Sequence, residues 1–271
     1  MRPIDFDDGA MLRALAARGE ADTGLFKDAR RRSFVALDLD GVALLLNRAC
    51  APGALERERD THALALARLL RDPDAAIVGG ELIKHDRTTT LAAVSLGGVE
   101  LVIKRYNRKS RVHGFTRLWR PTRARRSFDA ARWLLRRDIL TPIPLAFIER
   151  RSFGVLNHGA YLISLRHPGE NLLDSLNGGA LDGDDFDALI EEFRVLLKCL
   201  LRARAAHGDM KISNFIFDGE RLCVLALDAT RPYRVLWRAR RAFRRDLTRL
   251  LRNWEGTPYF AAVEALVREF D

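Results

Sequence analysis

The sequence predicts an α+β fold in which a strand-rich first part is followed by a helix-rich second part. Two observations carry this prediction. Gly97-Gly98 separates two strand-like segments at the two-residue spacing of a β-hairpin. In the second half, a long amphipathic helix is expected at 183–206, with further helices near 236–253 and 259–270. Strands that precede helices, instead of alternating with them, are typical of this class and indicate two lobes with a cleft between them.

The elements of the first part are bounded by proline, glycine and short polar turns. The segment Leu101-Val102-Ile103-Lys104 alternates in polarity, which places Lys104 on the strand face opposite Leu101 and Ile103. In chain order we expect a helix at 10–18, a hairpin at 33–47 around Asp40-Gly41, a helix at 60–71 that ends at Asp72-Pro73, a strand at 75–83, a turn at 84–87 and strands at 88–96 and 99–104.

The second part begins with an expected helix that stops near Thr141-Pro142-Ile143-Pro144, because proline cannot continue a helix. No internal repeat or long linker interrupts the chain. We expect an N-terminal extension at 1–74, a strand-rich lobe at 75–168 and a helical lobe at 169–271. The remaining elements expected are a helix at 122–137, a strand at 160–164, the helix at 183–206, and a hairpin from 215–217 to 222–227 around Asp218-Gly219.

Composition excludes several classes of protein. Of the 271 residues, 48% are hydrophobic and 30% are charged, which excludes a disordered chain. No apolar run approaches the roughly 18–20 residues of a membrane helix, and the acidic start lacks the features of a signal peptide. The three cysteines have no metal-binding spacing. We therefore expect a cytoplasmic protein.

The charge is strongly positive, at +10, and only six of the 46 basic residues are lysine. A compositional bias toward arginine and an anionic partner both explain this balance. Ten basic residues and no acid lie between Lys104 and Arg126, and seven arginines and no acid lie between Arg231 and Arg245. These stretches are either solvated faces or surfaces that dock on acidic lipid headgroups or a phosphorylated sugar–lipid. Nucleic acid is not expected, because no segment resembles a nucleic-acid-binding motif.

The strongest functional signal is His207-Gly208-Asp209-Met210-Lys211-Ile212-Ser213-Asn214, between the long helix and the hairpin. Asp209 and Asn214 have the spacing of the catalytic loop of protein kinases, H-R-D-x-x-x-x-N, with Gly208 in place of arginine. In that interpretation Asp209 accepts the proton of the attacking hydroxyl, Asn214 binds Mg²⁺ and Lys211 neutralises the transferring phosphate. The alternative is a polar loop whose turns are capped by Asp209 and Asn214.

Phosphoryl transfer also needs a cation that holds the nucleotide phosphates. Lys104 ends its strand as the lysine of the V-A-I-K strand does in kinases, although an ordinary solvated lysine remains the alternative. The loop from Lys84 to Thr90 contains no glycine, so we expect backbone amides and hydroxyls at Thr88 and Thr89 to cover the phosphates. Ser164, at the end of its strand, is a further candidate for nucleotide binding.

Four segments together resemble the bacterial lipopolysaccharide core kinases, the heptose- and Kdo-kinase-like proteins. The resemblance covers roughly residues 78–254. It implies a two-lobed protein-kinase-like fold, with a small antiparallel sheet in the N-lobe and a mainly helical C-lobe. It further implies ATP, Mg²⁺, and a sugar hydroxyl of the lipopolysaccharide core or another lipid-linked acceptor, at the cytoplasmic face of the inner membrane. The segments are Val102-Ile103-Lys104-Arg105-Tyr106-Asn107, the basic stretch ending Arg126-Ser127-Phe128, Thr141-Pro142-Ile143-Pro144-Leu145-Ala146 with Glu149, and His207-Gly208-Asp209-Met210-Lys211.

The sequence departs from the family pattern at the metal site. The family has an aspartate where this chain has Ala226, and the nearest acid is Asp228, two residues on. On a continuous strand Asp228 would point to the same side, so we expect it to be the replacement metal ligand. The helix at 122–137 also lacks the glutamate that kinases pair with the strand lysine. A catalytically weak pseudokinase that binds nucleotide or glycolipid is therefore the alternative, and a small-molecule kinase is a third option.

Overall fold

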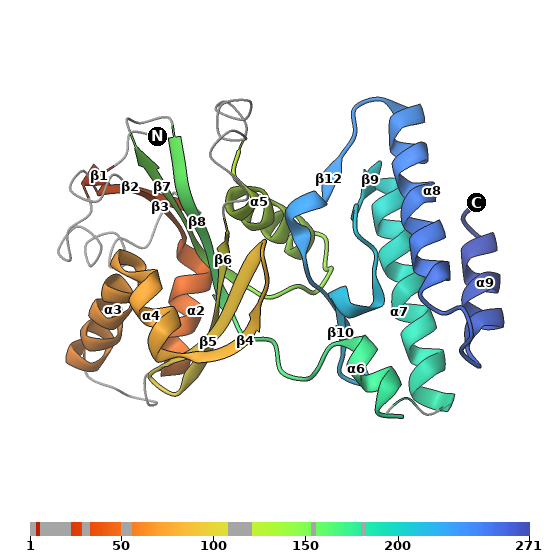
Figure 1. Cartoon of the computed structure of the whole chain (residues 1–271), viewed down its shortest axis with the longest axis horizontal. Helices are drawn as coiled ribbons and strands as arrows, with labels where there is room; N and C mark the ends of the chain where they lie inside the picture. Colours follow the sequence, from red (N-terminus) through yellow and green to blue (C-terminus); the bar gives the residue numbers. More distant parts are fainter. Residues whose placement is uncertain are drawn as a thin grey trace. The chain divides into compact units, whose positions relative to one another are not determined.

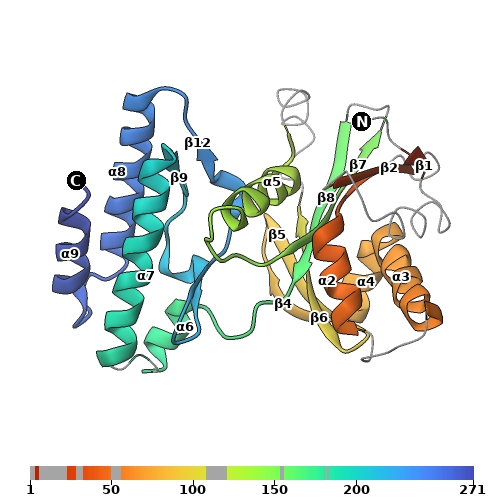
Figure 2. The same ribbon diagram turned by 180° about the vertical axis from the view of Figure 1, so that it is seen from behind.

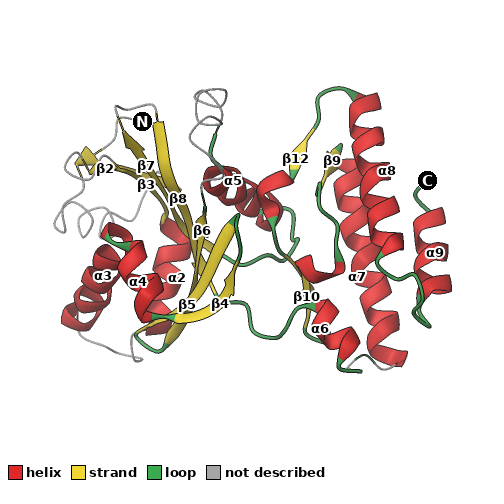
Figure 3. Cartoon of the chain, in the orientation of Figure 1, coloured by secondary structure: helices red, strands yellow, loops and turns green. Residues whose placement is uncertain are grey.

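The computed structural model describes residues 4–5, 23–28, 33–49, 56–107, 121–152, 156–179, 181 and 183–271. The chain divides into two compact units, Met1–Phe128 with Ile143–Arg166, and Asp129–Pro142 with His167–Asp271. Figure 3 shows most of the strands in the first unit and a mainly helical second unit, as the sequence predicted. The expected helix at 10–18 and most of the basic stretch at 104–126 lie outside the described residues.

An eight-stranded sheet forms the first unit, in the order β1-β2-β3-β7-β8-β6-β5-β4 (Figure 1). All neighbouring pairs are antiparallel except β1 and β2. Gly97 and Gly98 join β5 to β6 with positive φ angles of 58° and 75°, as a two-residue hairpin turn requires. The strands are β1 (Ile4–Asp5), β2 (Thr23–Asp28), β3 (Ser33–Asp38), β4 (Glu81–His85), β5 (Thr89–Leu96), β6 (Val99–Tyr106), β7 (Pro144–Ser152) and β8 (Leu156–Leu165).

Helices cover both faces of this sheet. Helices α2 (Leu39–Ala49), α3 (Glu56–Arg71) and α4 (Pro73–Gly79) lie on one side, and the first turns of α5 (Arg123–Leu135) lie on the other (Figures 1 and 2). Leu101 and Ile103 of β6 are fully buried in the cluster that includes α2 and α3. Tyr106, of opposite parity, packs with Phe128 of α5. Lys104 therefore lies on the α5 side of the sheet, and the alternation predicted for this strand is confirmed.

Two predicted elements of the first unit are wrong. Most of the strand expected at 75–83 is instead helix α4, because Asp72 caps the amide of Ala75 and Pro73 takes the first helical position. Only residues 81–83 of that range belong to a strand, β4. The hairpin expected at 33–47 is strand β3 followed by helix α2. The Asp38 carboxylate there accepts from the amide of Gly41. Gly41 serves close packing and not a turn, since a Cβ at this residue would lie 2.6 Å from the carbonyl oxygen of Pro144.

The second unit is built on two long helices, α7 (Gly183–Arg202) and α8 (Leu236–Arg252), and the shorter α9 (Phe260–Arg268), which lie side by side (Figures 1 and 2). Helix α7 ends before the predicted residue 206, because Arg204 takes a left-handed conformation with φ of 50°. The sequence analysis missed strand β7 and helix α6. The smaller elements are α6 (Leu172–Asn177), β9 (Ala205–Ala206), the 3₁₀ turns η2 (Ile212–Asn214) and η3 (Leu227–Ala229), and strands β10 (Phe215–Phe217), β11 (Leu222–Val224) and β12 (Arg231–Pro232).

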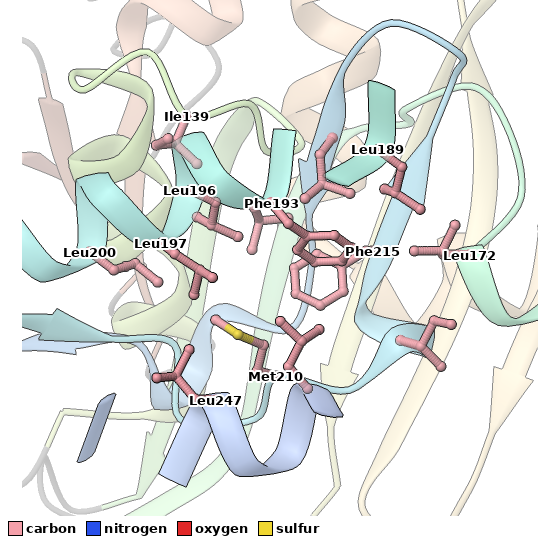
Figure 4. Close-up of a cluster of buried hydrophobic side chains, with 14 of the residues drawn as sticks. Ile139, Leu172, Leu189, Phe193, Leu196, Leu197, Leu200, Met210, Phe215 and Leu247 are labelled. Carbon is pink, nitrogen blue, oxygen red and sulfur yellow. The ribbon is translucent and has the colours of Figure 1, made fainter. Parts of the chain in front are cut away.

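The core of the second unit holds the predicted functional loop at 207–214. Met210 and Phe215 are fully buried and lie among Phe193 and Leu197 of α7 and Leu247 of α8 (Figure 4). From Asp209 to Ser213 polar and apolar residues alternate, and the apolar ones, Met210 and Ile212, are buried and fix the backbone. No helix of the described residues is both long and apolar enough to span a membrane.

Candidate active site

The 207–214 loop is held first by His207, whose ring is almost completely buried. Its Nε2 donates to the carbonyl oxygen of Leu225 at 2.8 Å, and its own carbonyl oxygen accepts from the hydroxyl of Thr230 at 3.2 Å. Its Nδ1 is buried without a hydrogen-bond partner among the described residues. The imidazole thus ties the start of the loop to the segment that follows β11, and its role here is structural.

Gly208 cannot be replaced by the arginine of the kinase pattern in this backbone. Its φ of +83° lies in the left-handed region. A Cβ there would lie 2.8 Å from the Cβ of Ala229 and 2.9 Å from its carbonyl oxygen. The departure from the kinase motif at this position follows from close contact between two segments of the second unit.

Asp246 of α8 anchors the same residue. Both of its carboxylate oxygens lie 3.0 Å from the amide nitrogen of Gly208. The side chain is 1% exposed, and burial raises its pKa, although the amide of Gly208 opposes that shift. A buried carboxylate without a donor is costly, so this contact fixes the loop firmly on α8. Asp246 was not predicted from the sequence. Its helical spacing from Phe243 and Leu250 places it among the buried apolar residues of α8, and this spacing is the signal that could have identified it.

Asp209 follows at once and its carboxylate is oriented from three directions. Oδ1 lies 3.0 Å from Nη1 of Arg249 and 3.6 Å from Nζ of Lys211. Oδ2 accepts from Nδ2 of Asn214 at 3.1 Å, and the same Nδ2 donates to the carbonyl oxygen of Asp209 at 2.8 Å. Asp209, Lys211 and Asn214, which the sequence singled out, therefore lie together. Arg249 is an additional member that the sequence analysis missed.

Arg249 also donates from Nη1 to the carbonyl oxygen of Gly208 at 2.9 Å. Because it lies three residues after Asp246 on α8, both side chains face the loop from one side of the helix. One cation and one carboxylate of α8 thus bind consecutive residues, Gly208 and Asp209.

The predicted metal position has an unusual backbone. Ala226 adopts φ 55° and ψ 47°, a left-handed conformation that aspartate, asparagine and glycine take more readily than alanine. Strand β11 ends at Val224 and not at Leu227 as predicted, and Asp228 lies in the 3₁₀ turn η3, half-buried. The expectation that Asp228 shares a strand face with Ala226 is therefore wrong, because the chain leaves the extended conformation between them.

No three histidine, cysteine or acidic side chains of the described residues gather as a metal site would require. Mg²⁺ commonly takes only one or two protein carboxylates when nucleotide phosphates supply the remaining oxygens. Asn214 and Asp228 carry the ligand types that this smaller demand needs, an amide oxygen and a carboxylate. The Nδ2 of Asn214 donates to Asp209, so the Oδ1 of Asn214, the atom that could bind a metal, lies on the opposite side of the amide.

The remaining predicted residues lie in the first unit. Lys104 is half-buried with Nζ 5.4 Å from the ring centre of Tyr106, and Ser164 is buried on the neighbouring strand β8. Lys104 pairs with Leu162 and Glu149 pairs with Ala160, so the lysine and this glutamate share one face of the sheet. Glu149 is 3% exposed and accepts from the hydroxyl of Thr122 at 2.7 Å, at the start of α5.

Asp86 occupies the donors of the expected phosphate loop. Its carboxylate accepts from the amides of Thr88 and Thr89 at 2.6 and 2.8 Å, and from their hydroxyls at 2.8 and 3.2 Å. The Thr88 hydroxyl, followed by the two amides, holds the pKa of Asp86 far below its usual range. The loop is therefore shaped around an anion, which its own side chain provides.

The structure is similar to the solved structure "WaaP in complex with acyl carrier protein", with a TM-score of 0.55 and 18% sequence identity, over 76% of this chain and 85% of that chain. At this sequence identity the likeness shows the fold, and the fold agrees with the one that the motifs indicated. The expected two-lobed protein-kinase-like fold is confirmed. No family model matches the sequence, and no curated protein matches it. Because 817 chains of solved structures match, the fold alone does not define a substrate.

Replacing Asp86 tests whether Thr88 and Thr89 hold nucleotide phosphates. Asp86→Ala releases two amides and removes a negative charge, so we expect ATP to bind roughly three- to tenfold more tightly, measured by titration calorimetry. Asp86→Asn keeps an acceptor for the loop and should show a smaller gain. Asp60→Ala removes an exposed charge from α3 and is the control. Unchanged or weaker binding in a folded Asp86→Ala protein would mean that these amides serve the turn and not the nucleotide.

Proposed function

We propose that this protein is an ATP-dependent kinase that phosphorylates a sugar hydroxyl of the lipopolysaccharide inner core. The observation that carries the proposal is the fixed carboxylate of Asp209, held by Arg249 and Asn214 on a loop anchored to Asp246. An oriented carboxylate on a rigid loop is what phosphoryl transfer requires, because catalysis there depends on positioning and electrostatics. The motifs that resemble the lipopolysaccharide core kinases support the choice of acceptor, and the likeness to WaaP agrees with them in fold.

In this proposal each polar residue of the candidate site has a separate role. Asp209 accepts the proton of the acceptor hydroxyl as the bond to phosphorus forms. Lys211, whose side chain is 54% exposed beside it, neutralises charge on the transferring phosphoryl group. Arg249 is a positioning residue, since it contacts Asp209 and the backbone of Gly208. Lys104, Thr88, Thr89 and Ser164 bind the nucleotide.

Asn214 and Asp228 would hold the Mg²⁺ ion, whose charge neutralises the nucleotide phosphates when it is bound. The chain offers one amide oxygen and one carboxylate for this purpose. We place the enzyme on the cytoplasmic face of the inner membrane, as a peripheral protein, because its acceptor is attached to lipid there.

A pseudokinase is the second candidate, and Ala226 is the specific observation that favours it. A kinase site that lacks its main metal carboxylate binds nucleotide without efficient transfer, and such a protein acts as a regulatory module that binds nucleotide or glycolipid. The third option, a kinase for soluble small molecules, differs in needing no membrane-bound acceptor. Measurable turnover separates the first candidate from the second, and the identity of the acceptor separates it from the third.

The first experiment compares Asp209→Ala with the native protein in transfer of phosphate from ATP to dephosphorylated lipopolysaccharide core. Turnover should fall about 10²–10⁴-fold, the usual contribution of a positioned acid–base group. ATP affinity should change little, because Asp209 contacts the acceptor. Full activity in Asp209→Ala would overturn the assignment of this residue.

A second experiment restores the family pattern at Ala226. Because the backbone there is already left-handed, aspartate fits without added strain. We expect Ala226→Asp to tighten Mg²⁺-dependent ATP binding by about tenfold and to raise turnover. Ala226→Asn has the same backbone preference without the charge, and Ala226→Gly only relieves strain. These two controls should stabilise the fold and leave Mg²⁺ dependence unchanged. Equal effects of all three substitutions would show that this position does not bind the metal.

A further inference from the structure

Three consecutive apolar side chains are exposed where α8 begins. Val235, Leu236 and Trp237 have exposed fractions of 42%, 46% and 59%. Large apolar side chains exposed next to one another mark interaction sites more often than single ones do. Further along α8, Phe243 and Leu247 are buried in the core of the second unit. The helix is therefore fixed on one side and presents its apolar first turn rigidly (Figure 1).

Arginines surround these three side chains. All seven arginines of Arg231–Arg245 are exposed, and no acidic residue lies in that stretch. The guanidinium of Arg238 lies 5.2 Å from the ring centre of Trp237, and that of Arg231 lies 5.0 Å from the ring centre of Tyr233. Arg244 pairs with Asp271 at 3.3 Å, on the exposed surface. The apolar side chains and the cations thus form one mixed surface, which we call the α8 tip.

The beginning of α8 is not optimised for helix stability. Val235 is at the N-cap with no capping hydrogen bond from its side chain, and the first turn contains no acidic residue. Arg238 stands near the helix N-terminus, where the helix dipole disfavours a positive charge. A sequence that gives up capping and dipole stabilisation while it exposes apolar residues indicates that another requirement shapes this surface.

We propose that the α8 tip docks the protein on an anionic lipid bilayer, with Val235, Leu236 and Trp237 inserted among the headgroups. Tryptophan is enriched at the membrane interface, and guanidinium groups bind lipid phosphates as bidentate donors. Each basic residue close to an anionic surface adds to the attraction. A folded acidic protein would satisfy the arginines, but it would need a matching pocket for three adjacent apolar side chains. A fluid headgroup layer receives them without one.

This inference deepens the proposed function, on which it rests, by naming the surface that meets the membrane. Leu236 and Asp246 are ten residues apart in sequence, which corresponds to about 15 Å along α8. The residue that docks and the residue that anchors the 207–214 loop therefore belong to one rigid helix. Docking through the α8 tip therefore holds the 207–214 loop at a fixed distance from the inserted side chains, because Asp246 and Arg249 of the same helix bind that loop.

The test measures co-sedimentation of the full chain with vesicles of phosphatidylcholine alone and of phosphatidylcholine mixed with phosphatidylglycerol. We expect binding to the mixed vesicles only, and weaker binding as salt increases, since screening shortens the reach of the arginines. Leu236→Ser with Trp237→Ser should weaken this binding roughly tenfold, because two apolar side chains lose their burial. Val195→Ser with Leu201→Ser, which alters two exposed apolar residues of α7, should bind as the native chain does.

Turnover of a water-soluble core oligosaccharide is measured on the same proteins and should be equal in both double variants. Absence of binding to mixed vesicles by the native chain, or equal binding by both double variants, would overturn the α8 tip as a membrane surface. Capture of an acidic protein by the native chain without vesicle binding would overturn it in favour of a protein partner. Vesicle binding that depends on Leu236 and Trp237, without phosphate transfer to any core acceptor, supports the docking surface while the proposed function fails.

Discussion

The contact between Asp246 and the amide of Gly208 is the constraint on which the candidate site depends. A carboxylate that is almost completely buried needs a donor, and the amide of Gly208 supplies one to both of its oxygens. Gly208 meets this demand only in a left-handed conformation that lies against Ala229. The backbone direction at Asp209, the next residue, follows from these two restrictions.

Helix α8 consequently connects several properties of the second unit. Its buried face completes the core around Met210 and Phe215, its acid and its Arg249 orient the 207–214 loop, and its first turn carries the exposed apolar residues. The many arginines of α8 do not contribute to the core, because the side chains that this helix buries are apolar except for Asp246. Helix α8 stabilises the fold through apolar packing and through Asp246. Most of its arginines are therefore on the exposed side of the helix, where they can meet an anionic surface.

Sequence reasoning predicted the parts of the site that are local in the chain. The five-residue spacing of Asp209 and Asn214 and the alternation around Lys104 were sufficient, because a short loop and one strand define them. Arg249 and Asp246 were missed, since their roles depend on how α8 packs on a segment far away in sequence. Helix α4 was predicted as a strand because a short apolar run fits both periods, and the cap at Asp72 decided the outcome. Asp228 was placed on a strand that in fact ends at Val224.

Transfer of phosphate to the lipopolysaccharide core, which we propose for this chain, changes the mass of that core. Core oligosaccharide is compared by mass spectrometry between cells with the gene, cells without it, and deleted cells that express either the native chain or Asp209→Asn. We expect deletion to remove one phosphate group, the native chain to restore it, and Asp209→Asn to leave it missing. A core whose phosphate content is identical in all four strains would show that this chain does not phosphorylate it.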